Sequence, residues 1–208
     1  MPKFQPEATD YDGWFDRHPV LFQSELEAIR SLLPPFEIGV EIGVGTGRFA
    51  ASLGIRQGLE PLGDYAKIAH NRGIEVVQGV AEQMPYPDGN FDLALMVTVD
   101  CFLDDVQKAF AETHRILKPG GSFVVAFLDK NGAFVKKYER SNSTSYKNAH
   151  FHGPTEIVGW MTKAGFSDFR FAQTLFAEDP ASPEAPRSGV GKGSFAVVSG
   201  RKIFEINS

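Results

Sequence analysis

The sequence has little of several features that define other classes of protein. Its 208 residues include one cysteine, Cys101, so neither an internal disulfide nor a cysteine-rich zinc site can form. Lysine and arginine number 21 against 26 aspartates and glutamates, which gives a net charge of −5, and no Lys/Arg-rich run occurs. Proteins that bind duplex nucleic acid usually need a basic surface. The sequence therefore predicts no nucleic-acid partner.

Long hydrophobic runs are also absent. The longest strongly apolar stretch, Phe123 to Leu128, is far too short to cross a bilayer, which takes about 20 residues. The segment from Met1 to Glu7 has no apolar core of the kind that a secretory signal requires. Together with the single thiol, these features predict a soluble, cytoplasmic protein with no membrane partner.

What the sequence does contain is an alternation of strand and helix patterns. Short apolar runs predict strands at residues 37–42, 58–60, 74–78, 91–99, 122–128, 169–176 and 195–200. Helices are predicted at residues 24–33, with Ser24 as its cap, and at 46–53, 63–72, 104–117 and 155–164. Such alternation indicates a mostly parallel sheet with right-handed crossovers. The last two strands have no helix between them, so we expect an antiparallel pair joined by a functional or mobile connection over residues 177–193.

A glycine-rich motif lies where the first predicted strand meets the first helix of this alternation. It reads Glu41-Ile-Gly-Val-Gly-Thr-Gly47. Glycines at such a turn let the backbone approach a ligand closely. The dinucleotide fingerprint fits only weakly, from Gly45 to Ala50, whereas the pattern acid-x-Gly-x-Gly-x-Gly is complete. The carboxylate of Glu41 would repel a pyrophosphate and attract an ammonium group, as in S-adenosylmethionine.

A second acidic residue, Glu60, ends the next predicted strand. A carboxylate at this position can accept hydrogen bonds from both hydroxyls of a ribose. The alternative is an exposed glutamate in a loop. The position of Glu60 at the strand end favours the ribose interpretation.

Four segments together carry a family resemblance. They are Glu41–Gly47, Leu59-Glu-Pro61, Gln78-Gly-Val-Ala-Glu-Gln-Met-Pro-Tyr-Pro-Asp-Gly-Asn-Phe-Asp92 and Arg115-Ile-Leu-Lys-Pro-Gly-Gly121. On these segments the chain resembles the class I S-adenosylmethionine-dependent methyltransferases, in particular the type 11 group, which is similar to the methyltransferases of ubiquinone and menaquinone biosynthesis. The resemblance is close over about residues 36–129 and holds in outline elsewhere.

The resemblance implies the architecture. We expect an α/β, Rossmann-like fold with a seven-stranded, mostly parallel sheet in the order 3-2-1-4-5-7-6, strand 7 antiparallel, and helices on both faces. Residues 1–208 would form a single domain in four parts. These are an N-terminal helical arm or lid (1–35), the cofactor-binding core (36–129), a substrate-side lid (130–152), and a terminal helix with a strand pair (153–208).

The resemblance also implies residues that bind the cofactor, S-adenosylmethionine. They are Glu41, Gly43, Gly45, Thr46 and Gly47 at the amino-acid end, Glu60 and Pro61 at the ribose, Val80, Ala81 and Glu82 at the adenine, Thr98 and Val99 beside the methyl group, and Tyr11 and Trp14 as a lid. The family commonly has Asp at the position of Val80, where it binds the adenine amino group. Val80 can pack against adenine, and we expect Ala81 and Glu82 to supply polar contacts.

The predicted catalytic residues lie on the substrate side. Asp100 follows the fourth core strand and is a candidate base or substrate anchor, with capping of the next helix as the alternative. His150 and His152 follow a run of aromatic residues and are candidate bases near neutral pH, with an exposed loop position as the alternative. Methyltransferases that act on amino groups of nucleic-acid bases or glutamine typically have the motif Asn/Asp-Pro-Pro-aromatic after the fourth core strand. This chain lacks the motif there, which counts against that chemistry. Metal-dependent methyltransferases of the catechol type have an adjacent Asp-Asn pair at the comparable strand end, whereas here Lys130 separates Asp129 from Asn131. The resemblance therefore implies no metal site.

These observations predict methyl transfer from S-adenosylmethionine to a small molecule through an oxygen, nitrogen or carbon nucleophile. Two alternatives stay open at this stage. The weak match from Gly45 to Ala50 allows an NAD-dependent oxidoreductase, and the lack of a clear catalytic base allows a non-catalytic protein that binds S-adenosylmethionine. A homodimer through an edge strand or residues 177–193 is a further open possibility.

Overall fold

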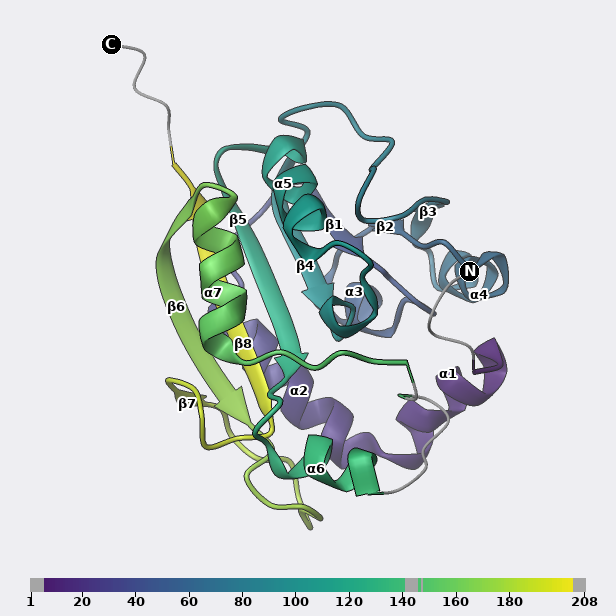
Figure 1. Ribbon diagram of the computed structural model, residues 1–208. Helices are drawn as coiled ribbons and strands as arrows, with labels where there is room; N and C mark the ends of the chain where they lie inside the picture. Colours follow the sequence, from purple (N-terminus) through teal and green to yellow (C-terminus); the bar gives the residue numbers. More distant parts are fainter. Residues whose placement is uncertain (1–5, 141–145, 147, 204–208) are drawn as a thin grey trace.

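The computed structural model describes residues 6–140, 146 and 148–203, which form one sheet flanked by helices (Figure 1). The strands are β1 (Gly39–Ile42), β2 (Gln57–Leu59), β3 (Glu75–Val77), β4 (Phe91–Val97), β5 (Leu117–Leu128), β6 (Phe166–Thr174), β7 (Arg187–Ser188) and β8 (Phe195–Lys202). Their order across the sheet is β3-β2-β1-β4-β5-β8-β6-β7.

The sheet confirms the predicted Rossmann-like topology and adds one strand to it. The five strands β1 to β5 are parallel, and β8 is antiparallel to both of its neighbours, β5 and β6. The eighth strand is β7, a two-residue segment that pairs with β6 inside the predicted connection over residues 177–193. A two-residue strand is too short to show a periodic pattern, so it could not be predicted from the sequence.

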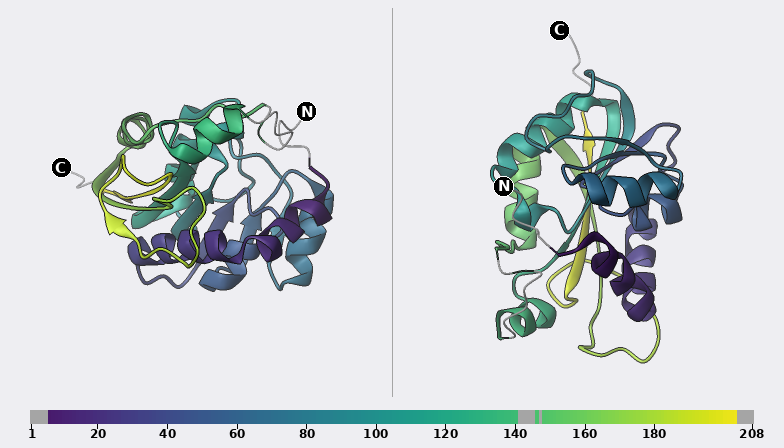
Figure 2. Two further views of the ribbon diagram at one scale, coloured as in Figure 1. Left: turned by 90° about the horizontal axis from the view of Figure 1, so that it is seen from below. Right: turned by 90° about the vertical axis from the view of Figure 1, so that its right-hand side faces the viewer.

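Helices cover both faces of the sheet (Figure 2). They are α1 (Ala8–Arg17), α2 (Pro19–Leu32), α3 (Arg48–Leu53), α4 (Gly63–Asn71), α5 (Val106–Ile116), α6 (Ala133–Arg140) and α7 (Pro154–Lys163), with a short 3₁₀ helix η1 (Asp100–Phe102). Alternate side chains of each strand enter two separate cores. On β5, Val124 packs in the core under α2 and α3, whereas its neighbour Phe123 packs in the core under α5 and α7.

The helix before the sheet is longer than predicted. It begins at Pro19 rather than Ser24, because proline suits the first position of a helix. Ser24 is therefore not its cap; the Ser24 hydroxyl donates a hydrogen bond to the carbonyl oxygen of Val20 at 2.8 Å. The helix ends at Leu32, just before Pro34, as predicted.

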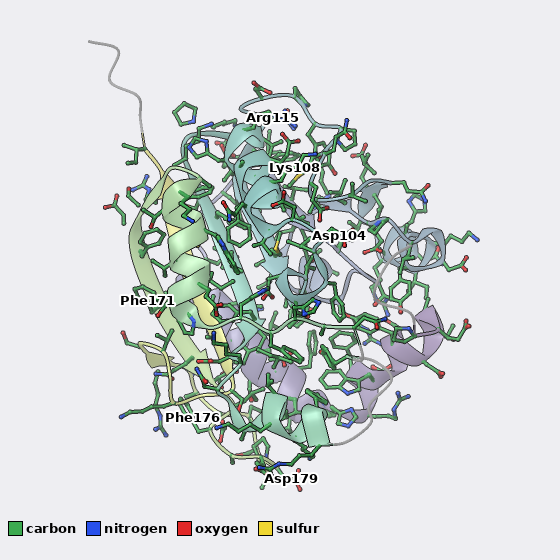
Figure 3. The ribbon with its side chains drawn as sticks, in the orientation of Figure 1. Asp104, Lys108, Arg115, Phe171, Phe176 and Asp179 are labelled. Atoms are coloured by element: carbon green, nitrogen blue, oxygen red, sulfur yellow. The ribbon has the colours of Figure 1, made fainter. Side chains whose placement is uncertain are left out.

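The connection from β6 to β8 is tied to α2. Its Glu184 N–H donates to the Ser24 hydroxyl at 2.9 Å, and the Glu184 carboxylate accepts from the Ala177 N–H at 3.1 Å. The Arg187 guanidinium lies 4.0 Å from the ring centre of Phe176. Figure 3 shows Phe176 and Asp179 at the end of the molecule opposite Arg115 of α5. These contacts fix part of the connection over residues 177–193, which the sequence predicted to be functional or mobile.

A search of the described ranges, 6–140, 146 and 148–203, finds no helix long and apolar enough to cross a membrane.

Candidate functional site

A cavity of about 1070 Å³ opens at the carboxyl ends of the parallel strands. Its walls include Gly43 after β1, Glu60 after β2, Thr98 after β4 and Leu128 at the end of β5. Open α/β sheets bind ligands at this edge. The volume lies at the top of the usual range for a ligand pocket, about 300–1,000 Å³. The cavity therefore has room for a cofactor and a second small molecule.

The glycine-rich loop presents bare backbone to the cavity. Gly43 and Gly45 have φ angles of +70° and +56°, in the left-handed region that favours glycine. A Cβ atom on Gly43 would collide with the side chain of Val99, and one on Gly45 would lie 3.4 Å from Cε1 of Tyr11. The Gly43 N–H donates to the Leu59 carbonyl at 2.8 Å, which fixes the loop to β2.

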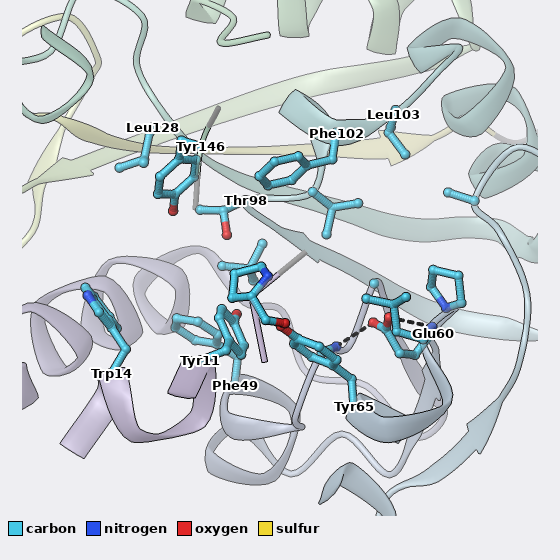
Figure 4. Close-up of a pocket in the computed structure, with 18 of the residues that line it drawn as sticks. Tyr11, Trp14, Phe49, Glu60, Tyr65, Thr98, Phe102, Leu103, Leu128 and Tyr146 are labelled. Carbon is cyan, nitrogen blue, oxygen red and sulfur yellow. Dashed lines mark hydrogen bonds between the residues drawn. The ribbon is translucent and has the colours of Figure 1, made fainter. Parts of the chain in front are cut away.

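Glu60 binds this loop from the end of β2. Its Oε2 accepts from the Gly45 N–H at 2.9 Å, and its Oε1 accepts from the Leu62 N–H at 3.0 Å (Figure 4). The residue is 5% exposed, and burial raises the pKa of its carboxyl against the opposing effect of these two bonds. Each carboxylate oxygen can accept more than one hydrogen bond. Glu60 therefore keeps acceptor capacity for ligand hydroxyls.

Glu41 lies on β1 behind the cavity wall. It is 2% exposed, and its Oε2 has no hydrogen-bond partner among the described residues. Burial raises the pKa of Glu41 well above its ordinary value; burial, and after it the charge of Glu41, also raises the pKa of Tyr11, which lines the cavity. A buried acceptor without a partner is costly. This arrangement suits a ligand that brings an ammonium group or another donor.

The loop after β3 forms an apolar part of the wall. Val80 lines the cavity and is 48% exposed, which gives a flat ring an apolar surface. The carboxylate of Glu82 also reaches the wall, where its Oε1 accepts from the N–H groups of Asp104 at 2.9 Å and Asp105 at 3.3 Å. Glu82 thus joins this loop to the segment before α5.

Aromatic side chains close the opposite end of the cavity. Tyr11 and Trp14 reach it from α1, Tyr138 from α6, and Tyr146 from the segment beyond α6 (Figure 4). The rings of Tyr138 and Tyr146 lie 4.7 Å apart, and Tyr146 stacks on Phe102 at 5.9 Å. Residues of the predicted lid segment, 130–152, therefore contribute to the wall.

An ion-pair cluster holds α1 against the glycine-rich loop and its helix. Asp12 lies 3.0 Å from the Arg48 Nε and 2.7 Å from the Arg72 Nη2. Arg72 also donates to the Thr46 carbonyl at 2.7 Å. Although burial opposes ionisation, hydrogen bonds from Arg48 and Arg72 hold the pKa of Asp12 well below its ordinary value. The cluster places Tyr11, one residue earlier, over Gly45.

Asp100 and His152, two predicted catalytic residues, contact each other. The Nδ1 of His152 lies 2.9 Å from the Oδ2 of Asp100, which is 2% exposed. Burial raises the pKa of Asp100, and the hydrogen bond with His152 opposes that effect. The described wall of the cavity includes neither residue, nor His150, which is exposed.

The alternative role for Asp100, capping the next helix, is wrong. Asp105 caps α5 instead, since its side chain accepts from the Lys108 N–H at 3.0 Å. Asp100 begins η1, which precedes that cap. Cys101 beside it is buried and forms no disulfide bond. Across the described ranges, no cluster of three or more histidine, cysteine or acidic side chains could hold a metal ion.

Most of the predicted cofactor residues lie together in the cavity wall. Those in the wall are Tyr11, Trp14, Gly43, Gly45, Glu60, Pro61, Val80, Ala81, Glu82, Thr98 and Val99. Glu41, Thr46 and Gly47 lie behind it. Two wall residues that the sequence analysis missed are Glu25 and Tyr65. The burial of Glu25 could have been predicted from the sequence, because Glu25 shares one helix face with Ala28, Ile29 and Leu32, all of which are buried.

Comparisons with known proteins agree with this geometry. A family model described as a methyltransferase domain matches residues 40–125. A crystal structure from Thermotoga maritima, described as a SAM-dependent methyltransferase and possible histamine N-methyltransferase, is 44% identical, with a TM-score of 0.90, over 93% of this chain and 95% of that chain.

Two curated relatives extend the comparison. An uncharacterized protein of Methanocaldococcus jannaschii is 36% identical over 98% of this chain and all of its own length. The demethylmenaquinone methyltransferase of Thermus thermophilus is 28% identical over 76% of this chain and 74% of its own. The match to the Thermotoga protein over 93% of this chain, together with the glycine-rich loop and Glu60, identifies S-adenosylmethionine as the cofactor. The chain belongs to the class I S-adenosylmethionine-dependent methyltransferases.

Proposed function

We propose that the protein transfers a methyl group from S-adenosylmethionine to a small molecule that enters the aromatic end of the cavity. The observation that carries this proposal is the arrangement of one cavity with two unlike ends. Glu60 and the glycine-rich loop form one end, and the rings around Tyr146 form the other (Figure 4). Thr98 lies on the wall between them.

In this proposal each part of the first end binds one part of the cofactor. Glu41 and the backbone of Gly43 and Gly45 hold the amino-acid group, and Glu60 accepts hydrogen bonds from the ribose hydroxyls. Val80 packs on the adenine, beside the backbone of Ala81. The unpartnered Oε2 of Glu41 and the remaining acceptor capacity of Glu60 support this assignment.

The bound cofactor supplies an electrophilic methyl group on a sulfonium, so the protein's task is to position the acceptor and exclude water. Thr98 is suited to a place beside the methyl group. Its φ angle is +51°, a strained conformation for a β-branched residue, and its N–H donates to the Ala126 carbonyl at 2.8 Å. Strain of this kind concentrates at functional sites.

Asp100, His150 and His152 remain our candidates for a base. The contact between Asp100 and His152 supports a positioning role as well. The pair joins η1 to the end of the lid segment, and the His150 N–H donates to the Cys101 carbonyl at 2.8 Å between the same two segments. In this role the pair holds Phe102 against Tyr146.

The proposal is tested by turnover with S-adenosylmethionine that carries a labelled methyl group. The acceptor screen begins with histamine, the possible acceptor of the Thermotoga protein, and extends to amines, phenols, thiols and carboxylic acids. Labelled product, confirmed by mass spectrometry, is the expected result. Protein that binds S-adenosylhomocysteine but labels no acceptor would support the alternative of a non-catalytic binding protein.

A further inference from the structure

Glu25 is a buried carboxylate in the cavity wall that none of the interactions above uses. It projects from the middle of α2 and is 8% exposed. Among the described residues it has no hydrogen-bond or ion-pair partner. Its neighbours on α2, Leu26 and Ile29, are core residues. A buried carboxylate without a partner is unfavourable unless a ligand supplies one.

Aromatic side chains line the same cavity as this carboxylate, namely Tyr11, Tyr138, Tyr146 and Trp14. Burial raises the pKa values of the three tyrosines, and the charge of Glu25 adds to this effect at each of them. The faces of aromatic rings attract cations, most strongly where water is excluded. A carboxylate among such faces is a site for a positive group.

The rest of the wall has the same electrostatic preference. Its described acidic residues are Glu7, Asp10, Glu25, Glu60, Glu82 and Asp104, and its described basic residue is Arg17. Arg17 is exposed and donates to the Asp10 carbonyl at 3.1 Å. An anionic acceptor would meet repulsion at this wall, and a neutral one would leave Glu25 unpaired.

We infer that Glu25, in the cavity that Tyr11, Tyr138 and Tyr146 also line, binds the protonated amine of an aromatic or alkyl amine substrate. Before methyl transfer to that nitrogen the ammonium passes its proton to the Glu25 carboxylate, because only the neutral amine has a lone pair. This inference rests on the proposed function and names the substrate class of the same site. Glu25 is a specificity-determining residue in this account. The cofactor end needs Glu60 and does not need Glu25.

The fold holds Glu25 in place without a partner of its own. The residue before it, Ser24, is fully buried; its hydroxyl donates to Val20 of the same helix and accepts from Glu184 in the β6–β8 connection. The helix is therefore anchored at the residue adjacent to the carboxylate. Preorganisation of this kind lowers the cost of binding.

Burial of Glu25 couples the binding of an amine to the release of a proton. It raises the pKa of Glu25 to about 8, so the empty site is mostly protonated at pH 6.5. The titratable groups that line the cavity with it, Tyr11 on α1, Tyr138 on α6 and Tyr146, have pKa values that burial raises above the ordinary value of tyrosine, so they stay neutral at pH 6.5. Binding of a protonated amine therefore releases close to one proton, from Glu25.

The test measures binding to protein saturated with S-adenosylhomocysteine, so it does not depend on turnover. The probes are 2-phenylethylamine, 2-phenylethanol and phenylacetate, followed by alkyl amines with their matched alcohols and acids. Calorimetry at pH 6.5, in buffers with different ionisation enthalpies, gives both affinity and proton release. The variants are Glu25→Gln and, as a control on the same helix, Glu27→Gln. The Glu27 carboxylate accepts a hydrogen bond from the Gln23 side chain at 3.0 Å, and Glu27 is not part of the described cavity wall.

We expect the amine to bind more tightly than the alcohol, and the acid least. Glu25→Gln should lower the affinity for the amine by about tenfold or more and abolish the proton release that accompanies binding. Its affinity for S-adenosylhomocysteine should stay within about twofold of the wild type. Glu27→Gln should match the wild type in every respect.

Two kinds of failure are distinguishable. If the wild type binds S-adenosylhomocysteine but no amine, or binds alcohols and acids as well as amines, the inference is overturned and the proposed function stands. An unchanged amine affinity in folded Glu25→Gln overturns it too. If the wild type does not bind S-adenosylhomocysteine, the proposed function itself fails.

Discussion

The two ends of the cavity are built in different ways. The cofactor end is mostly backbone, where Gly43, Gly45 and Leu62 are positioned by hydrogen bonds that run between β1, β2 and Glu60. The acceptor end is mostly side chain, where rings from α1 and α6 line the cavity together with Glu25. The backbone cradle of the cofactor end comes from about 20 consecutive residues, Gly43 to Leu62, whereas the acceptor end comes from segments more than 100 residues apart.

This difference separates what is fixed from what can vary. A backbone cradle depends on the absence of side chains, so few substitutions are tolerated in it. A pocket of rings can change shape and charge by single substitutions while the sheet stays intact. The same fold can therefore keep one cofactor and change its acceptor.

The largest effect is expected at the cofactor end, from Gly43→Ala. The new methyl group would collide with Val99 in a backbone conformation, φ +70°, that alanine avoids. We expect a loss of about 3 kcal/mol in the free energy of unfolding and a loss of more than about 100-fold in affinity for S-adenosylhomocysteine. The control is Gly63→Ala, at an exposed position with no atom within 4 Å of the new Cβ, which should bind normally. Normal binding by Gly43→Ala would contradict the role of this cradle.

A smaller effect is expected from Asp12→Asn, which weakens the ion pairs that hold α1 against the glycine-rich loop and α3. The free energy of unfolding should fall by about 1–3 kcal/mol at pH 7, because hydrogen bonds to Arg48 and Arg72 weaken. The folded-state pKa of Asp12 lies below that of the unfolded chain, so its contribution is present above about pH 4 and is lost as the pH falls. Denaturant unfolding at pH 7 and pH 3 measures the difference.

Asp64→Asn is the matched control for that experiment. Its ion pair with Lys67, 2.9 Å long, is fully on the surface and should contribute nothing measurable. A difference between wild type and Asp12→Asn that does not shrink at low pH would show that the ion-pair cluster is not what holds α1.

Asp100→Ala tests whether the acceptor end is held from outside the cavity. Removal of the carboxylate strands the Nδ1 of His152, at a cost of about 1–2 kcal/mol in the free energy of unfolding. Affinity for S-adenosylhomocysteine should change by less than about twofold. Asp88→Ala, at an exposed ion pair with Arg115, is the control. Loss of methyl transfer with an altered pH profile and unchanged stability would instead make Asp100 a catalytic base.

The smallest effect is expected at the border between the two ends, from Thr98→Gly. Release of the strain at φ +51° should offset the added flexibility of glycine and raise the free energy of unfolding by up to about 1 kcal/mol. Methyl transfer should slow. Asp168→Gly, at φ +54° on an exposed part of β6, should raise the free energy of unfolding less than Thr98→Gly does, because aspartate tolerates this conformation better than threonine. A clear loss of stability in Thr98→Gly would show that its side chain stabilises the fold.

The two ends also differed in how far the sequence predicted them. The motif from Glu41 to Gly47 and the acid Glu60 are local signals, since strand ends and glycines place them directly. The strand order was predicted from the family resemblance that these segments carry. The two-residue strand β7 did not, because it depends on its partner β6.

The acceptor end could be predicted only in part. The family resemblance predicted a substrate-side cover over residues 130–152, and Tyr138 and Tyr146 of that segment do line the cavity. The partnership of Asp100 with His152, 52 residues later, depends on tertiary packing that no local pattern encodes. Glu25 is the intermediate case, a charged residue in phase with the buried face of its helix.

The central claim is that Glu60 and the glycine-rich loop hold S-adenosylmethionine at one end of this cavity. The most direct test is a calorimetric titration of S-adenosylmethionine and S-adenosylhomocysteine into the wild type and Glu60→Ala, each shown to be folded and free of co-purified ligand. The account predicts saturable binding by the wild type and a loss of about 1–3 kcal/mol in the variant, from unpaired ribose hydroxyls. No binding by the wild type, or equal binding by Glu60→Ala, would contradict it.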